Sequence, residues 1–353
     1  MLSSRGAVTA PKRCRRRFLG PGICALASVC GIAVALSACG GASPAAAPST
    51  STTRPGPSET TTTKPASAMT FSAPHPVSTS GDLVAISCVL RSACLALDAK
   101  GDAYAYDGSR WAGPVAPGTA AGSGATSVSC VDATACWADP TGGDQLVEWD
   151  GTAWSAPSTL TAAHSLEAVG CAPDGYCAAV DALGDSFDLV DGSWQPTDGD
   201  WGAVSSISCV DPTFCVSASG GLSEWSGTGW SVPEPMGATT PFTGVSCASA
   251  SFCMAVDAGG QALQWNGSGW SEPAPVAAGT PTGGTAPDLT AVACASASFC
   301  VAGDSSGQLF AWADGAWAEL AGQGAGPLTS ISCPASSFCA AADGDAVRYG
   351  TAP

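Results

Sequence analysis

A pair of cysteines with five residues between them recurs seven times in this chain, and this repeat constrains the fold more than any other feature. The pairs are Cys88 and Cys94, Cys130 and Cys136, Cys171 and Cys177, Cys209 and Cys215, Cys247 and Cys253, Cys294 and Cys300, and Cys333 and Cys339. The first cysteines of successive pairs are 42, 41, 38, 38, 47 and 39 residues apart. A period near 40 residues indicates a repeat architecture, in which each unit buries its apolar surface against its neighbours.

Each repeat unit predicts four short β-strands. In the unit 242–276 the first strand ends at Cys247, the second begins at Phe252, and the third ends at Trp265. Asn266-Gly267 then predicts a tight hairpin, because this dipeptide favours positive φ angles, and the fourth strand opens with W-S-x-P. Four antiparallel strands per unit at this period predict an all-β fold, a seven-bladed β-propeller over residues 71–353.

The two ends of the repeat region complement each other. The last unit stops after Gly350 without a W-S-x-P strand, whereas residues 71–77 (FSAPHPV) are similar to residues 270–276 (WSEPAPV) of the complete unit. We therefore expect the N-terminal strand to supply the fourth strand of the last blade and close the ring.

The N-terminus has the pattern of an export signal. A cluster of arginines at 13–17 precedes an apolar stretch at 18–38, which ends in L-S-A-C-G at 36–40. This ending resembles the lipobox of bacterial lipoproteins. The resemblance implies that a signal peptide, residues 1–38, is cleaved before Cys39 and that Cys39 carries a diacylglyceryl lipid. An uncleaved transmembrane helix is the alternative, since 21 apolar residues are long enough to span a bilayer.

Export would place the protein on the extracytoplasmic face of the cell membrane, held there by the lipid. Residues 15–19 (RRRFL) also resemble the twin-arginine signal, so both that route and the general secretory route stay open. Residues 39–70 are rich in Pro, Thr, Ser and Ala, a composition that cannot bury a core, and we expect a lipid-anchored disordered linker there.

In an exported protein, an even number of cysteines at fixed spacing predicts disulfides, here one within each blade. Metal binding is the alternative, but it usually needs closer cysteine spacing together with histidines. Only His75 and His164 follow the linker, and we expect both to be isolated from other functional groups.

Residues 71–353 contain four Lys or Arg against 28 Asp or Glu, a net charge of −24. This charge excludes a nucleic-acid partner, which requires clustered basic residues, and contact with anionic lipid headgroups. We expect a monomer that touches the membrane only through its lipid.

The repeat period resembles that of WD-repeat propellers, and its Cys-x5-Cys form resembles exported propeller repeats of high-GC Gram-positive bacteria. The turn W-D-G-T-A-W at 149–154 also resembles the Asp-box of sialidase propellers, but sialidases use an arginine triad. Only Arg91, Arg110 and Arg348 lie in this domain, and an anionic sugar would be repelled, so we expect no sialidase activity.

We expect a non-catalytic binding propeller, with a cell-wall glycan, an extracellular protein or a small ligand as candidates. No G-x-S-x-G elbow, H-E-x-x-H motif or phosphate-binding loop occurs in the sequence, and we expect no cofactor apart from a candidate Ca²⁺. Two alternatives are an exo-acting glycosidase or lyase that uses acidic residues on one propeller face, and a scaffold of an envelope complex.

A ligand or cation site is predicted where strands two and three of each unit are joined. Six of the seven units place aspartates there: Asp98, Asp102, Asp139, Asp144, Asp181, Asp185, Asp257, Asp304, Asp343 and Asp345. A ring of carboxylates at a channel mouth would suit Ca²⁺ or a basic partner. The alternative is that Asp simply forms turns. Loop 277–290 is the longest on this face; Trp201 is a candidate exposed aromatic, whereas Trp137 fits the core.

Overall fold

The computed structural model describes residues 69–117, 124–160, 163–197, 199, 202–277, 286–313, 315–321 and 326–352. Within these ranges the regular elements are β-strands, and no helix is long and apolar enough to cross a membrane. The predicted signal peptide 1–38, Cys39, nearly all of the linker 39–70, Trp201 and most of loop 277–290 lie outside the described residues.

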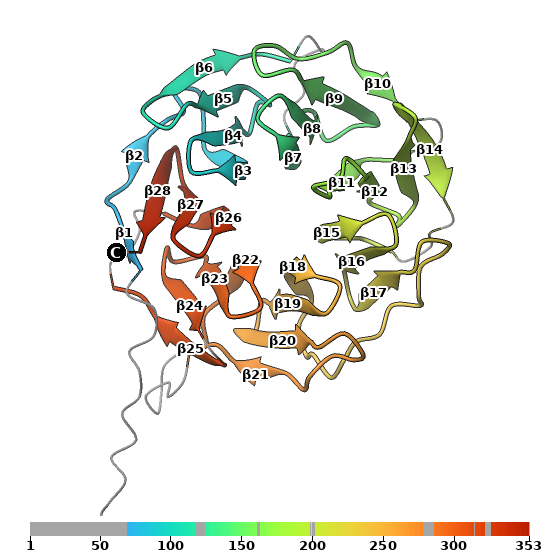
Figure 1. Cartoon of the computed structure of the whole chain (residues 1–353), viewed down its shortest axis with the longest axis vertical. Helices are drawn as coiled ribbons and strands as arrows, with labels where there is room; N and C mark the ends of the chain where they lie inside the picture. The colour runs from blue at the N-terminus through green and yellow to red at the C-terminus, as the bar shows by residue number, and fades with distance from the viewer. Residues whose placement is uncertain are drawn as a thin grey trace, which may run out of the picture. The chain divides into compact units, whose positions relative to one another are not determined.

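Seven antiparallel sheets are arranged in a ring around a central axis (Figure 1). In each sheet the first strand is innermost and the later strands follow outwards. The strands of blades 1 to 3 are β3 (Leu83–Leu90), β4 (Ala93–Asp98), β5 (Ala103–Tyr106) and β6 (Trp111–Val115); β7 (Ser127–Asp132), β8 (Ala135–Asp139), β9 (Gln145–Trp149) and β10 (Ser158–Thr159); and β11 (Leu166–Cys171), β12 (Cys177–Asp181), β13 (Ser186–Val190) and β14 (Ser193–Thr197).

Blades 4 to 7 repeat this order. Their strands are β15 (Ser206–Asp211), β16 (Phe214–Ala218) and β17 (Leu222–Trp225); β18 (Phe242–Ser249), β19 (Phe252–Asp257), β20 (Gln261–Trp265) and β21 (Ala274–Pro275); β22 (Leu289–Ser296), β23 (Phe299–Asp304), β24 (Leu309–Ala313) and β25 (Ala316–Glu319); and β26 (Leu328–Ala335), β27 (Phe338–Asp343) and β28 (Ala346–Thr351). The fourth strand of blade 4 is reduced to single bridges, Leu222 with Glu234 and Trp225 with Trp230.

The fourth strand is interrupted because the W-S-x-P proline has no N–H to donate to the ladder. The serine of the motif compensates for part of this loss. In blade 2 the Ser155 hydroxyl accepts the Glu148 N–H at 3.0 Å, while the Ser155 N–H donates to the Glu148 carbonyl at 2.7 Å. Ser231 and Ser271 bond in the same way to Glu224 and Gln264.

The N-terminal segment closes the ring as the sequence predicts. β1 (Thr70–Phe71) and β2 (His75–Pro76) both pair with β28. The Ser72 hydroxyl accepts the Tyr349 N–H at 3.1 Å, which repeats the serine contact of the other blades. Met69 is buried as well, so the closing segment begins two residues before the predicted boundary at residue 71.

Seven apolar clusters hold the blades together, one between each pair of neighbours. The second strands have both faces covered by adjacent blades. In blades 5 to 7 every residue of the second strand is buried, and the strand residues between the cysteine and the final Asp are mostly Ala and Val. Small apolar side chains suit this position because two sheets must approach closely.

The turns between strands one and two pack against the turns between strands three and four on one face, which we call the disulfide face. A Cβ on Gly108 would lie 2.8 Å from the Ser92 side chain, and one on Gly151 would lie 2.9 Å from Thr134. Both glycines also have φ above +90°. Glycine is therefore needed there for the turn and for the contact. The other connections form the opposite face, which we call the connection face.

Candidate functional site

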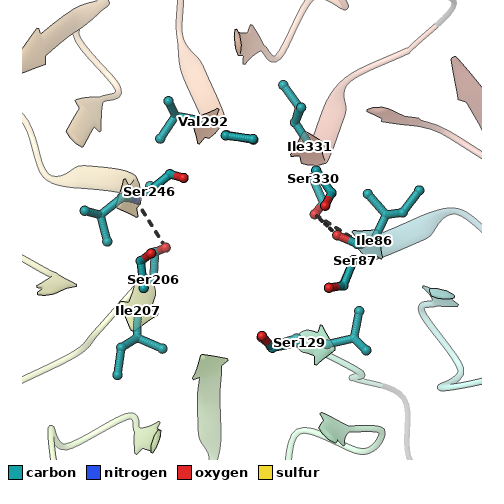
Figure 2. A pocket seen from close by; sticks show the side chains of 18 of the residues that line it. Ile86, Ser87, Ser129, Ser206, Ile207, Ser246, Val292, Ser330 and Ile331 are labelled. Atoms are coloured by element: carbon teal, nitrogen blue, oxygen red, sulfur yellow. Dashed lines mark hydrogen bonds between the residues drawn. The ribbon is translucent and has the colours of Figure 1, made fainter. Parts of the chain in front are cut away.

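The central channel has a volume of about 460 Å³, and its wall is formed by the first strands of the blades (Figure 2). One ring of the wall consists of β-branched aliphatic residues, among them Ile86, Ile207 and Val292. Short hydroxyl side chains, such as Ser87 and Ser129, form the neighbouring rings. Among the described residues that line the channel there is no Asp, Glu, Lys, Arg or His. The channel can therefore hold a partner through shape and hydrogen bonds.

Many of the channel hydroxyls join neighbouring blades. The residue before the first cysteine is serine in five blades, and each of these hydroxyls accepts the backbone N–H of the first cysteine in the next blade. The pairs, with their distances, are Ser87–Cys130 (3.1 Å), Ser129–Cys171 (2.9 Å), Ser208–Cys247 (3.0 Å), Ser246–Cys294 (2.9 Å) and Ser332–Cys88 (2.9 Å). Gly170 and Ala293 occupy this position in blades 3 and 6, where the bond is missing.

Two further positions add bonds of the same kind. Ser330 accepts the Ile86 N–H at 3.1 Å (Figure 2), and Thr243 donates to the Leu289 carbonyl at 2.7 Å. In blade 3 all three positions lack a hydroxyl, because they hold Glu167, Ala168 and Gly170. Within the described residues, the boundary between β11 and β15 therefore has no such bond and rests on apolar packing.

The seven disulfides lie within the blades, each between the first two strands. The two cysteines are directly opposed in blades 1 to 6, and in blade 7 they lie at a register shift between β26 and β27. The Cα atoms of each pair are 3.9–4.1 Å apart. Each bridge crosslinks one hairpin at the disulfide face and leaves no free thiol among the described cysteines. This arrangement matches the pairing that the sequence predicts.

The predicted aspartates do not line the channel. Asp98, Asp139, Asp181, Asp257, Asp304 and Asp343 end the second strands, one strand outside the channel wall, and all six are buried. Asp102, Asp144, Asp185 and Asp345 lie in or next to the following turns and are partly or fully exposed.

The buried aspartates fix the turns of the connection face. In Asp257, Oδ1 accepts the N–H groups of Gly259 and Gln261 at 3.0 and 2.8 Å, and Asp304 holds its turn in the same way. Blade 4 has Ser219 instead, whose hydroxyl bonds Gly221. These aspartates therefore stabilise turns, which is the alternative role that the sequence predicts for them. The calcium site remains a prediction.

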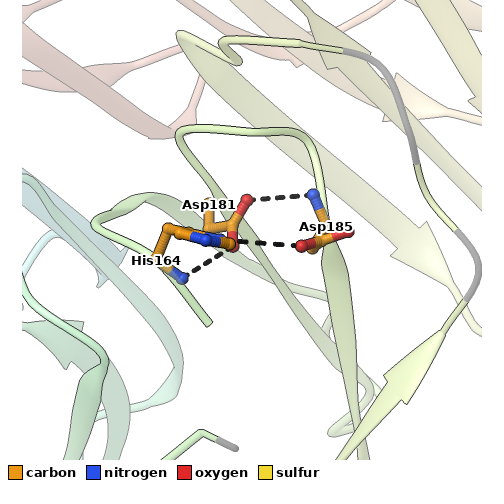
Figure 3. A group of neighbouring side chains, drawn as sticks. All are labelled: His164, Asp181 and Asp185. Carbon is orange, nitrogen blue, oxygen red and sulfur yellow. Dashed lines mark hydrogen bonds and ion pairs between the residues drawn. The ribbon is translucent and has the colours of Figure 1, made fainter. Parts of the chain in front are cut away.

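In blades 1 to 3 the second carboxylate oxygen of these aspartates bonds the connection that enters the blade. Ser80 donates to Asp98 in blade 1, and Thr126 donates to Asp139 in blade 2 at 2.9 Å. In blade 3 the donor is His164, whose backbone N–H lies 2.8 Å from Asp181 Oδ2 and whose Nδ1 lies 3.3 Å from the same oxygen. His164 Nδ1 also lies 3.7 Å from Asp185 Oδ2 (Figure 3).

His164 is therefore not isolated, contrary to the expectation from the sequence. The signal that could have found this group is the Asp-x3-Asp spacing of Asp181 and Asp185, combined with the histidine that enters the same blade. His75 instead lies in β2, with its ring centroid 5.3 Å from that of Tyr349.

Acidic groups surround this part of the connection face. Burial raises the pKa of Asp139 to about 6, with a smaller contribution from the charge of Glu167. Burial also raises the pKa of Glu167, as does the charge of Asp181. The Glu167 carboxylate therefore repels Asp139 across the boundary between blades 2 and 3, and Asp181 within its own blade.

Several tryptophans join neighbouring blades. The fourth-strand tryptophans reach the preceding blade: the indole N–H of Trp154 donates to the Val115 carbonyl at 3.2 Å, and that of Trp270 donates to Glu224 at 2.7 Å. Trp137 is buried and packs edge-on against Trp194 of the next blade. These contacts agree with the expected packing of neighbouring blades.

The basic residues of the domain do not form a carboxylate site. Arg348 is buried; its Nη1 donates to the Gly307 carbonyl at 3.0 Å, and its guanidinium lies over the Phe71 ring of the closing segment. Arg110 is exposed and pairs with Asp107 in its own hairpin turn. Arg348 therefore stabilises the ring closure.

Comparison with solved structures places this architecture among known propellers. The domain is a seven-bladed β-propeller that resembles WD40 propellers. It is similar to the structure of U3-55K (TM-score 0.67, 12% identity, covering 81% of this chain and 99% of that one) and to the WD40 β-propeller domain of Doa1 (TM-score 0.66, 12% identity, 80% and 97%). It is also similar to YCF48 bound to a D1 peptide (TM-score 0.61, 14% identity, 79% and 94%). At these identities the likeness concerns the fold. No protein-family model and no curated protein matches the sequence.

Proposed function

We propose that this protein is a lipid-anchored binding propeller on the extracytoplasmic face of the membrane, and that its partner is a basic segment of an extracellular protein. The observation that carries the binding role is the channel, whose wall presents hydroxyl and aliphatic groups and no ionisable residue. Propellers of the WD40 type generally act as binding or scaffold domains, and YCF48, a similar fold, is bound to a peptide.

The charge of the domain supports a basic partner. Residues 71–353 carry a net charge of −24, which would attract a positively charged segment and repel anionic glycans. The binding role is preferred to the glycosidase or lyase alternative because the buried aspartates are bonded within turns. Burial leaves these carboxylates little contact with a substrate as large as a sugar.

A binding measurement with designed mouth variants tests this role. The full-length protein in detergent would be screened against extended peptides of graded Lys and Arg content and against cell-wall glycan fragments. We expect salt-dependent binding of the basic peptides. Val210, which lines the channel, allows a charge-reversal pair: Val210→Arg should weaken peptide binding and Val210→Glu should strengthen it. Equal binding by the two variants, or binding of glycans only, would refute the proposal.

The anchor is tested separately. Cells that express the protein would be labelled with a fatty acid, fractionated and treated with protease from outside. Wild-type protein should carry the label, stay with the membrane and be digested, whereas Cys39→Ala should lose the label. Retention of label in Cys39→Ala, or protection from external protease, would contradict the anchor. Neither result bears on peptide binding.

A further inference from the structure

We propose that blade 3 binds a divalent transition-metal cation of the zinc class through His164, Asp181 and Asp185. The three residues come from separate parts of the blade: His164 from the connection that enters it, Asp181 from the end of β12, and Asp185 from the turn before β13. One ligand atom from each lies within 4.8 Å of the others (Figure 3). This site is independent of the proposed partner binding at the channel.

The distances fit a tetrahedral ion. His164 Nδ1 lies 3.3 Å from Asp181 Oδ2 and 3.7 Å from Asp185 Oδ2. Zinc bonds of about 2.0–2.2 Å to nitrogen and oxygen place neighbouring tetrahedral ligands about 3.3–3.6 Å apart. A cation could therefore enter between these atoms with small side-chain adjustments and without movement of the backbone.

The supporting bonds hold one ligand rigidly and leave the other two adjustable. Oδ1 of the buried Asp181 accepts the N–H groups of Leu183 and Asp185, both at 2.9 Å, which fixes the orientation of its carboxylate. The side chains of His164 and Asp185 are about half exposed, so an ion can reach the site from solvent. Bonds that orient a ligand from outside the coordination sphere are typical of metal sites.

The chemistry of the three ligands selects the ion class. One imidazole and two carboxylates suit zinc and similar borderline cations, whereas Ca²⁺ prefers six to eight oxygens. Three protein ligands leave a fourth position for water or for a ligand from a partner. Glu167 adds negative charge close to Asp181.

Blade 1 provides a comparison within the same molecule. Asp98 and Asp102 have the same spacing as Asp181 and Asp185, and Asp98 Oδ1 holds its turn with the same two bonds. There Ser80 takes the place of His164, with its hydroxyl hydrogen-bonded to Asp98 and to Asp102. A hydroxyl completes the turn network, but it is a poor transition-metal ligand. Blade 3 therefore differs in the one group that metal binding requires.

Calorimetric titration of ZnCl₂ into the full-length protein tests the site. The protein would first be treated with N-ethylmaleimide, so that no free cysteine thiol can bind the ion. We expect one saturable zinc site, proton release on binding, and visible absorption bands of tetrahedral coordination when Co²⁺ replaces zinc. His164→Ala and Asp185→Asn should each weaken binding at least tenfold.

The controls separate this site from unspecific binding. His75→Ala removes the other histidine, and Asp102→Asn removes the corresponding carboxylate of blade 1; both should bind zinc like the wild type. Circular dichroism and thermal melting would verify the fold of every variant. Absence of saturable binding in the wild type, or equal affinity of His164→Ala and the wild type, would overturn the proposal and would show that His164 and Asp181 form a hydrogen bond only.

Discussion

Ser246 and Ala293 occupy the same position in adjacent blades, one residue before the first cysteine, and only Ser246 carries a hydroxyl. The Ser246 hydroxyl accepts the Cys294 N–H, whereas the Cys333 N–H has no such acceptor from Ala293. A net hydrogen bond of this kind contributes about 1 kcal/mol to the free energy of unfolding. The two positions therefore allow the same hydrogen bond to be removed at residue 246 and added at residue 293.

We predict that Ser246→Ala lowers the free energy of unfolding by about 1 kcal/mol and that Ala293→Ser raises it by a similar or smaller amount. Denaturant unfolding of both variants and the wild type measures the two changes. Gly170→Ser is the matched control, because a Cβ there would lie 3.1 Å from the Ile207 carbonyl oxygen, and the clash should outweigh any new bond. Stabilisation by Gly170→Ser would contradict this account of the boundary between blades.

Asp139 gives a prediction about pH. Its pKa rises from 3.8 to about 6 in the folded protein, so the folded state favours the protonated carboxyl. The stability that the protonated Asp139 contributes is fully present below about pH 4 and is lost as the pH rises through about 6. Asp139→Asn keeps an oxygen for the Thr141 and Gly142 N–H groups and removes the charge.

Between pH 4 and pH 7, the wild type should therefore lose about 2 kcal/mol of stability relative to Asp139→Asn. Urea unfolding at the two pH values measures the difference. The exposed Asp150 is the control, because hydrogen bonds from its own turn lower its pKa. Relative to Asp150→Asn, the wild type should therefore gain stability as the pH rises, which is the opposite direction. A difference that does not depend on pH would show that Asp139 titrates normally.

At the scale of the element, the sequence predicted the strands whose signal is local. The cysteines marked the first two strands, and the Asn-Gly and Asp-Gly turns marked the third and fourth. The W-S-x-P segment was predicted as the fourth strand; its proline interrupts the ladder, and its serine hydroxyl accepts a backbone N–H of the third strand. The group around His164 was signalled only by the Asp-x3-Asp spacing and by the histidine in the connection that enters the same blade. The serine contacts between blades could not be predicted, because they join residues of separate blades.

The crosslinked first hairpin gives a prediction at this scale. Seven bridges within the blades should make the mass of the unreduced protein fourteen hydrogens lower than that of the reduced protein over residues 69–352. Peptide mapping under non-reducing conditions should find every bridge within one blade. Peptides that link cysteines of two different blades would contradict the pairing.

At the scale of the whole molecule, the ring is held by contacts between blades and by one closure that the chain must make with itself. Residues at 70–77 pair with β28, and Arg348 of β28 contacts the closing segment and the Gly307 carbonyl of blade 6. The boundary between blades 3 and 4 is the opposite case, since it lacks the hydroxyl bonds found elsewhere. The boundaries between blades therefore differ in their hydrogen bonds, and the ring closure depends on the buried Arg348 and on the N-terminal segment.

Removal of the closing segment should open the ring. Deletion of residues 69–77 exposes one edge of β28 and uncovers the buried Arg348, and we expect the melting temperature to fall by on the order of 10 °C, as a loss of several kcal/mol would cause. Deletion of nine residues from the predicted linker, 50–58, is the matched control and should leave melting unchanged. Differential scanning calorimetry of both deletions decides the matter. If the two proteins melt at the same temperature as the wild type, the N-terminal strand does not hold the ring closed.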